Sequence, residues 1–281
     1  TSVAIHGNTI VVGAGLDNTD KGGNSGSAYV YTRDGTGTSA KWTKQTKLVP
    51  KDGAADDWFG GSVAIHGGII VVGAEGDYTD NGKRLDNANG YDSGSAYVYT
   101  RDGTGTSAKW TQQTKLVAND GAADDRFGWS VAIHGNTIVV GANREPSSSQ
   151  RMVPQRTALA VTPTMARTAG PPTSIPAPVP VRSAKWTQQT KLVAKDGAAG
   201  DYFGTSVAIH GNTIVVGANR DDDNGSSSGY LDDDNGRSSG SAYVYTRDGK
   251  YRYKCKLDTD QAHRRGWCRR GPLWPQCCHS W

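Results

Sequence analysis

The feature that most constrains this chain is a sequence that it writes four times. The string SVAIHGNTIVVGA begins at Ser2, Ser130 and Ser206, and the variant SVAIHGGIIVVGA begins at Ser62. The starting points are 60, 68 and 76 residues apart. Three units contain GSAYVYTRDG and three contain KWTxQTKLV, and the first two units contain both. A unit of this size cannot bury an apolar face alone, so we expect neighbouring units to stack.

The pattern within each unit predicts four short β-strands. In the first unit, apolar residues 3–5 and 10–12 flank Gly7-Asn8, which is a two-residue hairpin signal between β-branched runs. Residues 27–32 and 42–49 supply two further strands, and no part of the repeat has a helical period. The fold class is therefore all-β, and the fitting architecture is a β-propeller-like array of four-stranded blades. A straight β-solenoid is the competing architecture, but its repeats are usually much shorter.

A Phe-Gly pair precedes three of the four strings. The pairs are Phe59-Gly60, Phe127-Gly128 and Phe203-Gly204, and they contain all three phenylalanines of the chain. Phe-Gly-x-Ser-Val-Ala, a strand ending in Gly-Ala, and then Gly-Ser-Ala-Tyr-Val-Tyr resemble the FG-GAP repeat of integrin α-subunit propellers and related surface proteins. The resemblance implies an extracellular or cell-surface setting and a protein or glycan ligand. We expect the phenylalanines to pack between blades as the structural motif of the repeat.

The resemblance also raises the question of calcium. The family commonly carries a calcium loop between Phe-Gly and the Gly-Ala strand end, but this chain has His-Gly-Asn-Thr or His66-Gly67-Gly68-Ile69 there, without a carboxylate. Acidic residues occur in the next loop instead. They are candidate ligand-binding residues of the propeller rim: Asp17, Asp20, Asp77, Asp80, Asp221, Asp223, Asp232 and Asp234. The last four are also candidate calcium ligands. The alternative interpretation is that Asp, Asn and Gly simply form solvated turns.

Two segments depart from the repeat and divide the chain. Residues 1–144 contain the first two units and the start of the third, and residues 183–249 contain the end of the third and the fourth. Between them, residues 145–182 form a Pro- and Ala-rich insert, and residues 250–281 form a basic tail with all four cysteines. Both segments can be back-translated so that a neighbouring reading frame spells the missing repeat. The hypothesis is that both are out-of-frame repeat sequence, which predicts irregular backbone in residues 145–182 and 250–281. The array would then be incomplete.

Several functional classes are excluded by composition or spacing. A transmembrane span is excluded, because mean hydropathy is −0.59 and no apolar run approaches twenty residues. Residues 1–30 also lack a signal peptide pattern. The cysteines of the tail do not have the spacing of a zinc site. The positive charge of the tail is better explained by a segment that was not selected as protein sequence than by nucleic-acid binding. No cofactor motif occurs, and the candidate ion for the acidic loops is calcium or magnesium.

The recurring histidines and serines are residue types that can act as catalytic groups. His6, His66, His134 and His210 each stand before a hairpin glycine, where duplication of the unit accounts for their recurrence. The serines at the start of each string lack a nucleophile elbow. The sequence therefore predicts a non-catalytic binding or adhesion module whose variable rim loops contact the ligand. The alternatives are a structural spacer array, a non-functional fragment of a larger propeller protein, and, less favoured, an enzyme acting at a central channel.

Overall fold

The structure is a computed structural model that describes ten stretches of the chain. They are residues 1–35, 40–80, 83–84, 92–119, 121–143, 158–164, 185–194, 201–221, 240–246 and 250–256. Within these stretches the regular structure is β-strand, apart from one 3-10 turn, η2 (Gly105–Ser107), and there is no α-helix. The all-β class is confirmed.

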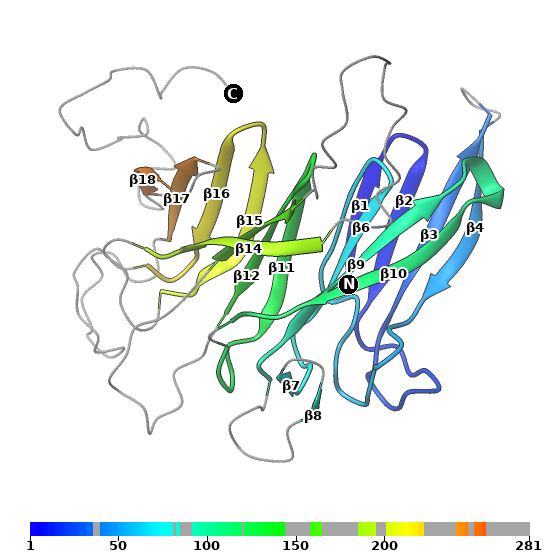
Figure 1. The fold of residues 1–281 in the computed structure, drawn as a ribbon, viewed down its shortest axis with the longest axis horizontal. Helices are drawn as coiled ribbons and strands as arrows, with labels where there is room; N and C mark the ends of the chain where they lie inside the picture. The colour runs from blue at the N-terminus through cyan, green and yellow to red at the C-terminus, as the bar shows by residue number, and fades with distance from the viewer. Residues whose placement is uncertain are drawn as a thin grey trace, which may run out of the picture.

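The strands form four antiparallel four-stranded sheets, which we call blades 1 to 4 (Figure 1). Blade 1 contains β1 (Ser2–His6), β2 (Thr9–Ala14), β3 (Ser27–Asp34) and β4 (Lys41–Leu48). Blade 2 contains β5 (Val63–His66), β6 (Ile69–Ala74), β9 (Ser95–Asp102) and β10 (Lys109–Leu116). Blade 3 contains β11 (Phe127–His134), β12 (Thr137–Ala142), β13 (Ala158–Thr164) and β14 (Lys185–Leu192). Blade 4 contains β15 (Phe203–His210), β16 (Thr213–Ala218), β17 (Ser241–Thr246) and β18 (Tyr251–Lys256). A separate ribbon pairs β7 (Thr79–Asp80) with β8 (Lys83–Arg84).

The first two strands of each blade form the predicted hairpin. In blade 1 the last pair is His6 with Thr9, and Gly7 between them has a φ of 57°. A Cβ on Gly7 would meet nothing within 4 Å, so the glycine is needed for its backbone conformation and not for space. The same register closes the hairpins of the other three blades.

Two strands lie where irregular backbone was expected. Ala158–Thr164 pairs with both β12 and β14, and Tyr251–Lys256 pairs with β17. The expectation of irregular structure is therefore wrong for these residues. The physical reason is that β12, β14 and β17 present rows of backbone N–H and C=O groups, which an extended segment can satisfy with little regard to its side chains. The rest of residues 145–182 and 250–281, apart from Lys250, lies outside the described residues.

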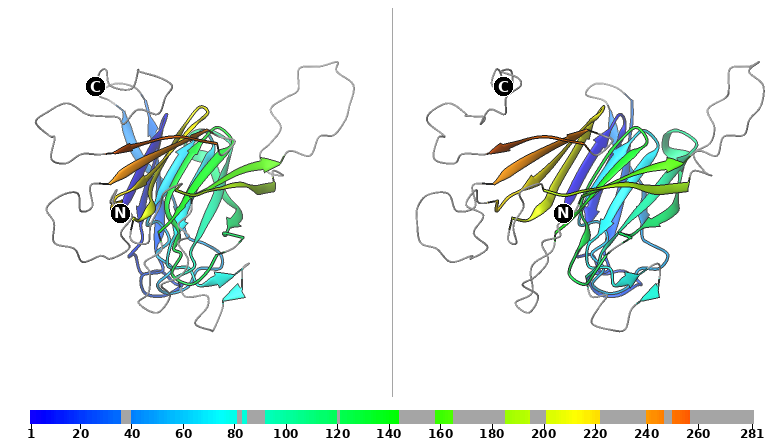
Figure 2. Two further views of the ribbon diagram at one scale, coloured as in Figure 1. Left: turned by 90° about the vertical axis from the view of Figure 1, so that its left-hand side faces the viewer. Right: turned by 60° about the vertical axis from the view of Figure 1, so that its left-hand side comes forward.

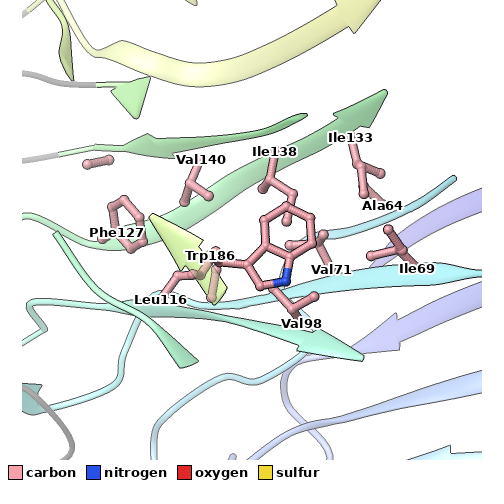
Figure 3. Packing of buried hydrophobic residues seen from close by; sticks show 12 residues of the cluster. Ala64, Ile69, Val71, Val98, Leu116, Phe127, Ile133, Ile138, Val140 and Trp186 are labelled. Carbon is pink, nitrogen blue, oxygen red and sulfur yellow. The ribbon is translucent and has the colours of Figure 1, made fainter. Parts of the chain in front are cut away.

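Three hydrophobic clusters sit between the blades rather than inside them. The cluster between blades 1 and 2 joins Val11 and Val30 of one sheet to Val63 and Ile65 of the next. The cluster between blades 2 and 3 includes Val71, Val98 and Phe127, and Figure 3 shows Trp186 of β14 lying across it. The third cluster joins Val139 and Leu192 of blade 3 to Phe203, Val216 and Tyr243 of blade 4. The units therefore stack through their sheet faces, as the repeat length predicted.

The blades follow one another in an open row. The first strand of each blade contacts the first strand of the next, in the order β1, β5, β11, β15. Figure 1 shows this row, with blade 1 in blue and blade 4 in yellow and orange, and the two turned views of Figure 2 show the blades overlapping one another. The histidines at the ends of these strands form a column, with ring centroids 4.7, 4.9 and 4.8 Å apart from His6 to His210.

Candidate ligand-binding rim

The ends of the blades opposite the Gly7-type hairpins carry two kinds of loop. One follows the second strand of a blade, and the other leads into the first strand of the next blade. We call these loops together the rim; β7 and β8, at the bottom of Figure 1, belong to it. Backbone hydrogen bonds join the two kinds, for example from the Trp58 N–H to the Asn24 carbonyl at 3.1 Å.

Asp17, Asp77 and Asp221 begin the rim loops of blades 1, 2 and 4 at equivalent positions. In each blade the aspartate carbonyl accepts a hydrogen bond from the glycine that precedes the third strand: Gly26, Gly94 or Gly240. The backbone bonds show that each aspartate closes its loop at the base.

The carboxylate of each of these aspartates is held by groups of its own blade. Asp17 accepts hydrogen bonds from Ser27 (2.6 Å) and Tyr29 (2.9 Å) and pairs with Lys47 at 2.9 Å. These contacts lower the pKa of Asp17 to about 2, and the hydrogen bond from Ser27 has the largest effect, followed by that from Lys47.

Blade 2 repeats this arrangement in full, and blade 4 keeps its tyrosine contact, whereas the Ser241 hydroxyl has no partner among the described residues. Asp77 accepts from Ser95 (2.6 Å) and Tyr97 (2.9 Å) and pairs with Lys115 at 2.6 Å. Asp221 accepts from Tyr243 at 2.6 Å. The structure thus places three of the predicted ligand-binding aspartates in intrablade contacts.

The remaining acidic candidates have less structural information. Asp20 is exposed on the rim loop of blade 1. Asp80 lies in β7, but its side chain is outside the described part of the structure, and so are Asp223, Asp232 and Asp234. The roles of all these residues in ligand binding stay a prediction.

The described residues do not fit a calcium site. Among them, no three His, Cys, Asp or Glu side chains are grouped so that they could hold a metal ion. Calcium needs six to eight oxygen ligands, whereas the Asp17 and Asp77 carboxylates already engage a lysine and two hydroxyl groups each. Calcium binding by the Asp221, Asp223, Asp232 and Asp234 group stays a prediction, which isothermal titration of calcium into the full chain tests directly.

Sequence reasoning missed the loops that lead into blades 2, 3 and 4. The residue before each Phe-Gly pair has a positive φ: 54° at Trp58, 48° at Arg126 and 53° at Tyr202. Bulky residues rarely adopt this conformation, which costs about 1–3 kcal/mol. The following phenylalanine is buried each time. The positive φ is needed because the chain turns sharply to insert that phenylalanine between blades.

These strained positions differ in side chain from unit to unit. The Arg220 guanidinium stands over the Tyr202 ring, with its central carbon 4.5 Å from the ring centroid, and it donates a hydrogen bond to the Tyr202 hydroxyl at 3.1 Å. The guanidinium carbon of Arg126 lies 5.8 Å from the centroid of the Trp129 ring, and its Nη2 forms an ion pair with Asp92 Oδ2 at 3.8 Å. Unit-specific aromatic and charged groups therefore gather at the rim. The sequence signal that could have identified these loops is a residue on either side of the constant Phe-Gly pair that changes from unit to unit.

Glu75 and Asp57 are two further rim carboxyls in unusual environments. Glu75 stands where the other units have Gly15, Asn143 or Asn219. Burial raises the pKa of Glu75 to about 7, and burial together with the charge of Asp77 raises the pKa of Asp57 to about 7. Asp57 accepts a hydrogen bond from the Ala54 N–H at 2.6 Å.

Several buried polar atoms at the rim have no hydrogen-bond partner among the described residues. They include Trp58 Nε1, Glu75 Oε2, Arg126 Nε and Asn143 Oδ1. All four of these side chains stand at positions where the units differ. An unpaired buried donor or acceptor of this kind costs about 1–3 kcal/mol.

Comparison with known families supports the repeat assignment. The sequence model of the FG-GAP repeat matches residues 1–31, 42–99, 110–151 and 186–231, which is more than half of the chain. The curated proteins compared with the chain include no match. Among the residues that the structure describes, none forms a helix long and apolar enough to cross a membrane. The matched stretches include strands of all four blades, and the chain belongs to the FG-GAP repeat family.

Proposed function

We propose that this chain is a non-catalytic, extracellular or cell-surface binding module whose rim contacts a protein or glycan ligand. Proteins with FG-GAP repeats are typically extracellular and generally not enzymes. The observation that carries the proposal is the distribution of sequence differences. The first two strands of each blade are almost identical from unit to unit, whereas Trp58, Arg126 and Tyr202 differ at one structural position of the rim. Specific recognition needs such differences on a rigid scaffold.

The chemistry of the rim suits binding. Aromatic and arginine side chains are the groups that most often dominate recognition surfaces. By contrast, the serines of the repeated string serve the scaffold: Ser62 and Ser130 donate hydrogen bonds to the carbonyls of Gly128 (2.6 Å) and Gly204 (2.8 Å) in the next blade. These contacts explain the recurrence of the serines without a catalytic role.

The test is to probe the full chain on a glycan microarray and on an array of secreted proteins. A hit is then measured with a Trp58→Ala/Tyr202→Ala variant and with a matched His6→Ala/His210→Ala variant, which alters exposed side chains at the opposite ends of the blades. We expect the rim variant to weaken binding about tenfold or more and the histidine variant to leave it unchanged. Equal binding by both variants, or no hit on either array, contradicts the proposal.

A further inference from the structure

Each blade has two faces that perform different tasks in the row. We call the face that packs on the preceding blade the front, and the face that packs on the following blade the back. The front of blade 2 contributes Val63, Ile65 and Tyr97 to its interface, and the back of blade 1 contributes Val11 and Val30. Val71 and Val98 of blade 2 pack with Ile133 of blade 3 in the second interface, and Val139 of blade 3 packs with Tyr243 of blade 4 in the third. The chain therefore contains three related front-to-back interfaces, with β13 as the strand that departs from the repeat.

The front of blade 1 carries the same side chains but is open. Val3 and Ile5 are 69% and 63% exposed, whereas their counterparts Val63 and Ile65 are 6% and 7% exposed. The sequence Ser-Val-Ala-Ile-His is the same in both blades. An exposed pair of β-branched residues on a flat sheet is an apolar surface suited to an interface.

The back of blade 4 is the matching surface at the other end of the row, and it is partly exposed, although Val244, at the position of Val30, is buried. Val215 and Ala242 occupy the positions of Val11 and Ala28, which are completely buried in blade 1. Both are only partly buried in blade 4. Ser206 adds a polar match, because its counterpart Ser2 accepts a hydrogen bond from the backbone N–H of Val63 at 3.2 Å. The N–H of Val3 is the equivalent donor on the open front.

We propose that the front of blade 1 binds the back of blade 4 of a second copy of this chain. The occupant follows from the three internal interfaces, which show what kind of surface covers a front with this sequence. The contact is heterologous, since a front meets a back, so it generates a closed ring or an open chain of molecules. In either case the histidine column continues from His210 of one copy to His6 of the next.

The first experiment measures self-association of the full chain by sedimentation velocity under reducing conditions across a range of concentrations. We expect reversible association, weakened about tenfold or more by Val3→Ser/Ile5→Ser. The matched control is Leu16→Ser, because Leu16 is 73% exposed but lies in a rim loop outside the front. Circular dichroism verifies that each variant keeps its strands. A chain that stays monomeric, or equal effects of the two variants, overturns the proposal.

The second experiment distinguishes front-to-back from front-to-front association. A Val215→Ser variant keeps an intact front, and the Val3→Ser/Ile5→Ser variant keeps an intact back. We expect each variant alone to associate at least about tenfold more weakly than the unmodified chain, and an equimolar mixture to form mixed pairs. Undiminished self-association of Val215→Ser overturns the front-to-back geometry. If Val215→Ser loses strand structure, the first experiment decides alone.

Discussion

Blades 1 and 2 have nearly the same sequence and very different burial. Strands β3 and β9 both read Ser-Ala-Tyr-Val-Tyr-Thr-Arg-Asp, but Tyr29 and Tyr31 are half-buried, whereas Tyr97 and Tyr99 are 0% and 3% exposed. The difference arises because blade 1 covers the front of blade 2, while no described residue covers the front of blade 1 to the same extent. In this fold the repeat determines the sheet, and the neighbouring blade determines the burial.

Removing the side chain that seals blades 1 and 2 is expected to have the largest effect. Phe59 is fully buried and makes edge contacts with Tyr97 and Tyr99, with centroids 5.4 and 6.1 Å apart. We expect Phe59→Ala to destabilise the chain by about 3–5 kcal/mol because it leaves a cavity. Chemical denaturation measures the loss, and hydrogen exchange should show β9 becoming less protected while β3 changes little. Unchanged protection of β9 contradicts the account.

The two aspartate networks allow the same substitution in two environments. Asp77 and Lys115 have side chains 1% and 12% exposed, and Asp17 and Lys47 have side chains 27% and 33% exposed. We expect Asp77→Asn to cost about 3 kcal/mol, since it breaks a buried ion pair, and Asp17→Asn to cost less than about 1 kcal/mol. Denaturation midpoints of the two variants, compared side by side, test this; equal costs would show that burial is not the cause.

Paired truncations on the two fronts test the apolar part of the comparison. Ile65→Ala removes a buried side chain and is expected to cost about 2–3 kcal/mol. Ile5→Ala removes a side chain that is 63% exposed, and we expect it to cost less than about 1 kcal/mol. The measurement is thermal unfolding at a concentration low enough to disfavour self-association. A large effect of Ile5→Ala under that condition would mean that blade 1 is covered.

Acidic groups of the two blades are expected to respond to pH in opposite directions. The pKa of Asp17 is lowered from 3.8 to about 2, so its stabilising effect is present above pH 4 and lost as the pH falls towards 2. The pKa of Glu75 is raised from 4.5 to about 7, so its stabilising effect is present below pH 4.5 and lost as the pH rises through 7.

Substitution of each carboxyl identifies its part of the pH profile. We expect Asp17→Asn to remove part of the stability change between pH 4 and 2, and Glu75→Gln to remove part of the loss between pH 4.5 and 7. Asp20→Asn, on an exposed side chain, is the control and should leave both limbs unchanged. Denaturation midpoints from pH 2 to 9 provide the readout. A Glu75→Gln profile identical to that of the unmodified chain contradicts the assignment.

Much of the fold could be predicted from the repeat. The hairpin at Gly7, the four-strand unit and the stacking of units all follow from local pattern and repeat length. The strands at 158–164 and 251–256 could not be predicted, because their pairing depends on the free backbone edges of neighbouring strands and not on their own pattern. The rim aspartates were identified as candidates, but their contacts with Tyr29 and Tyr97 link residues of different strands that only the folded sheet brings together.

The sequence by itself determined that this chain is an array of four-stranded FG-GAP units, since a repeated alternation of apolar and polar residues permits little else. Only the tertiary structure decided which of the repeated side chains are buried. Val3 and Val63 occupy the same position of the same string, and they differ in exposure tenfold, at 69% and 6%. The physical reason is that a side chain is buried only where a second surface packs on it, and the repeated string is the same whether or not a neighbouring blade covers it.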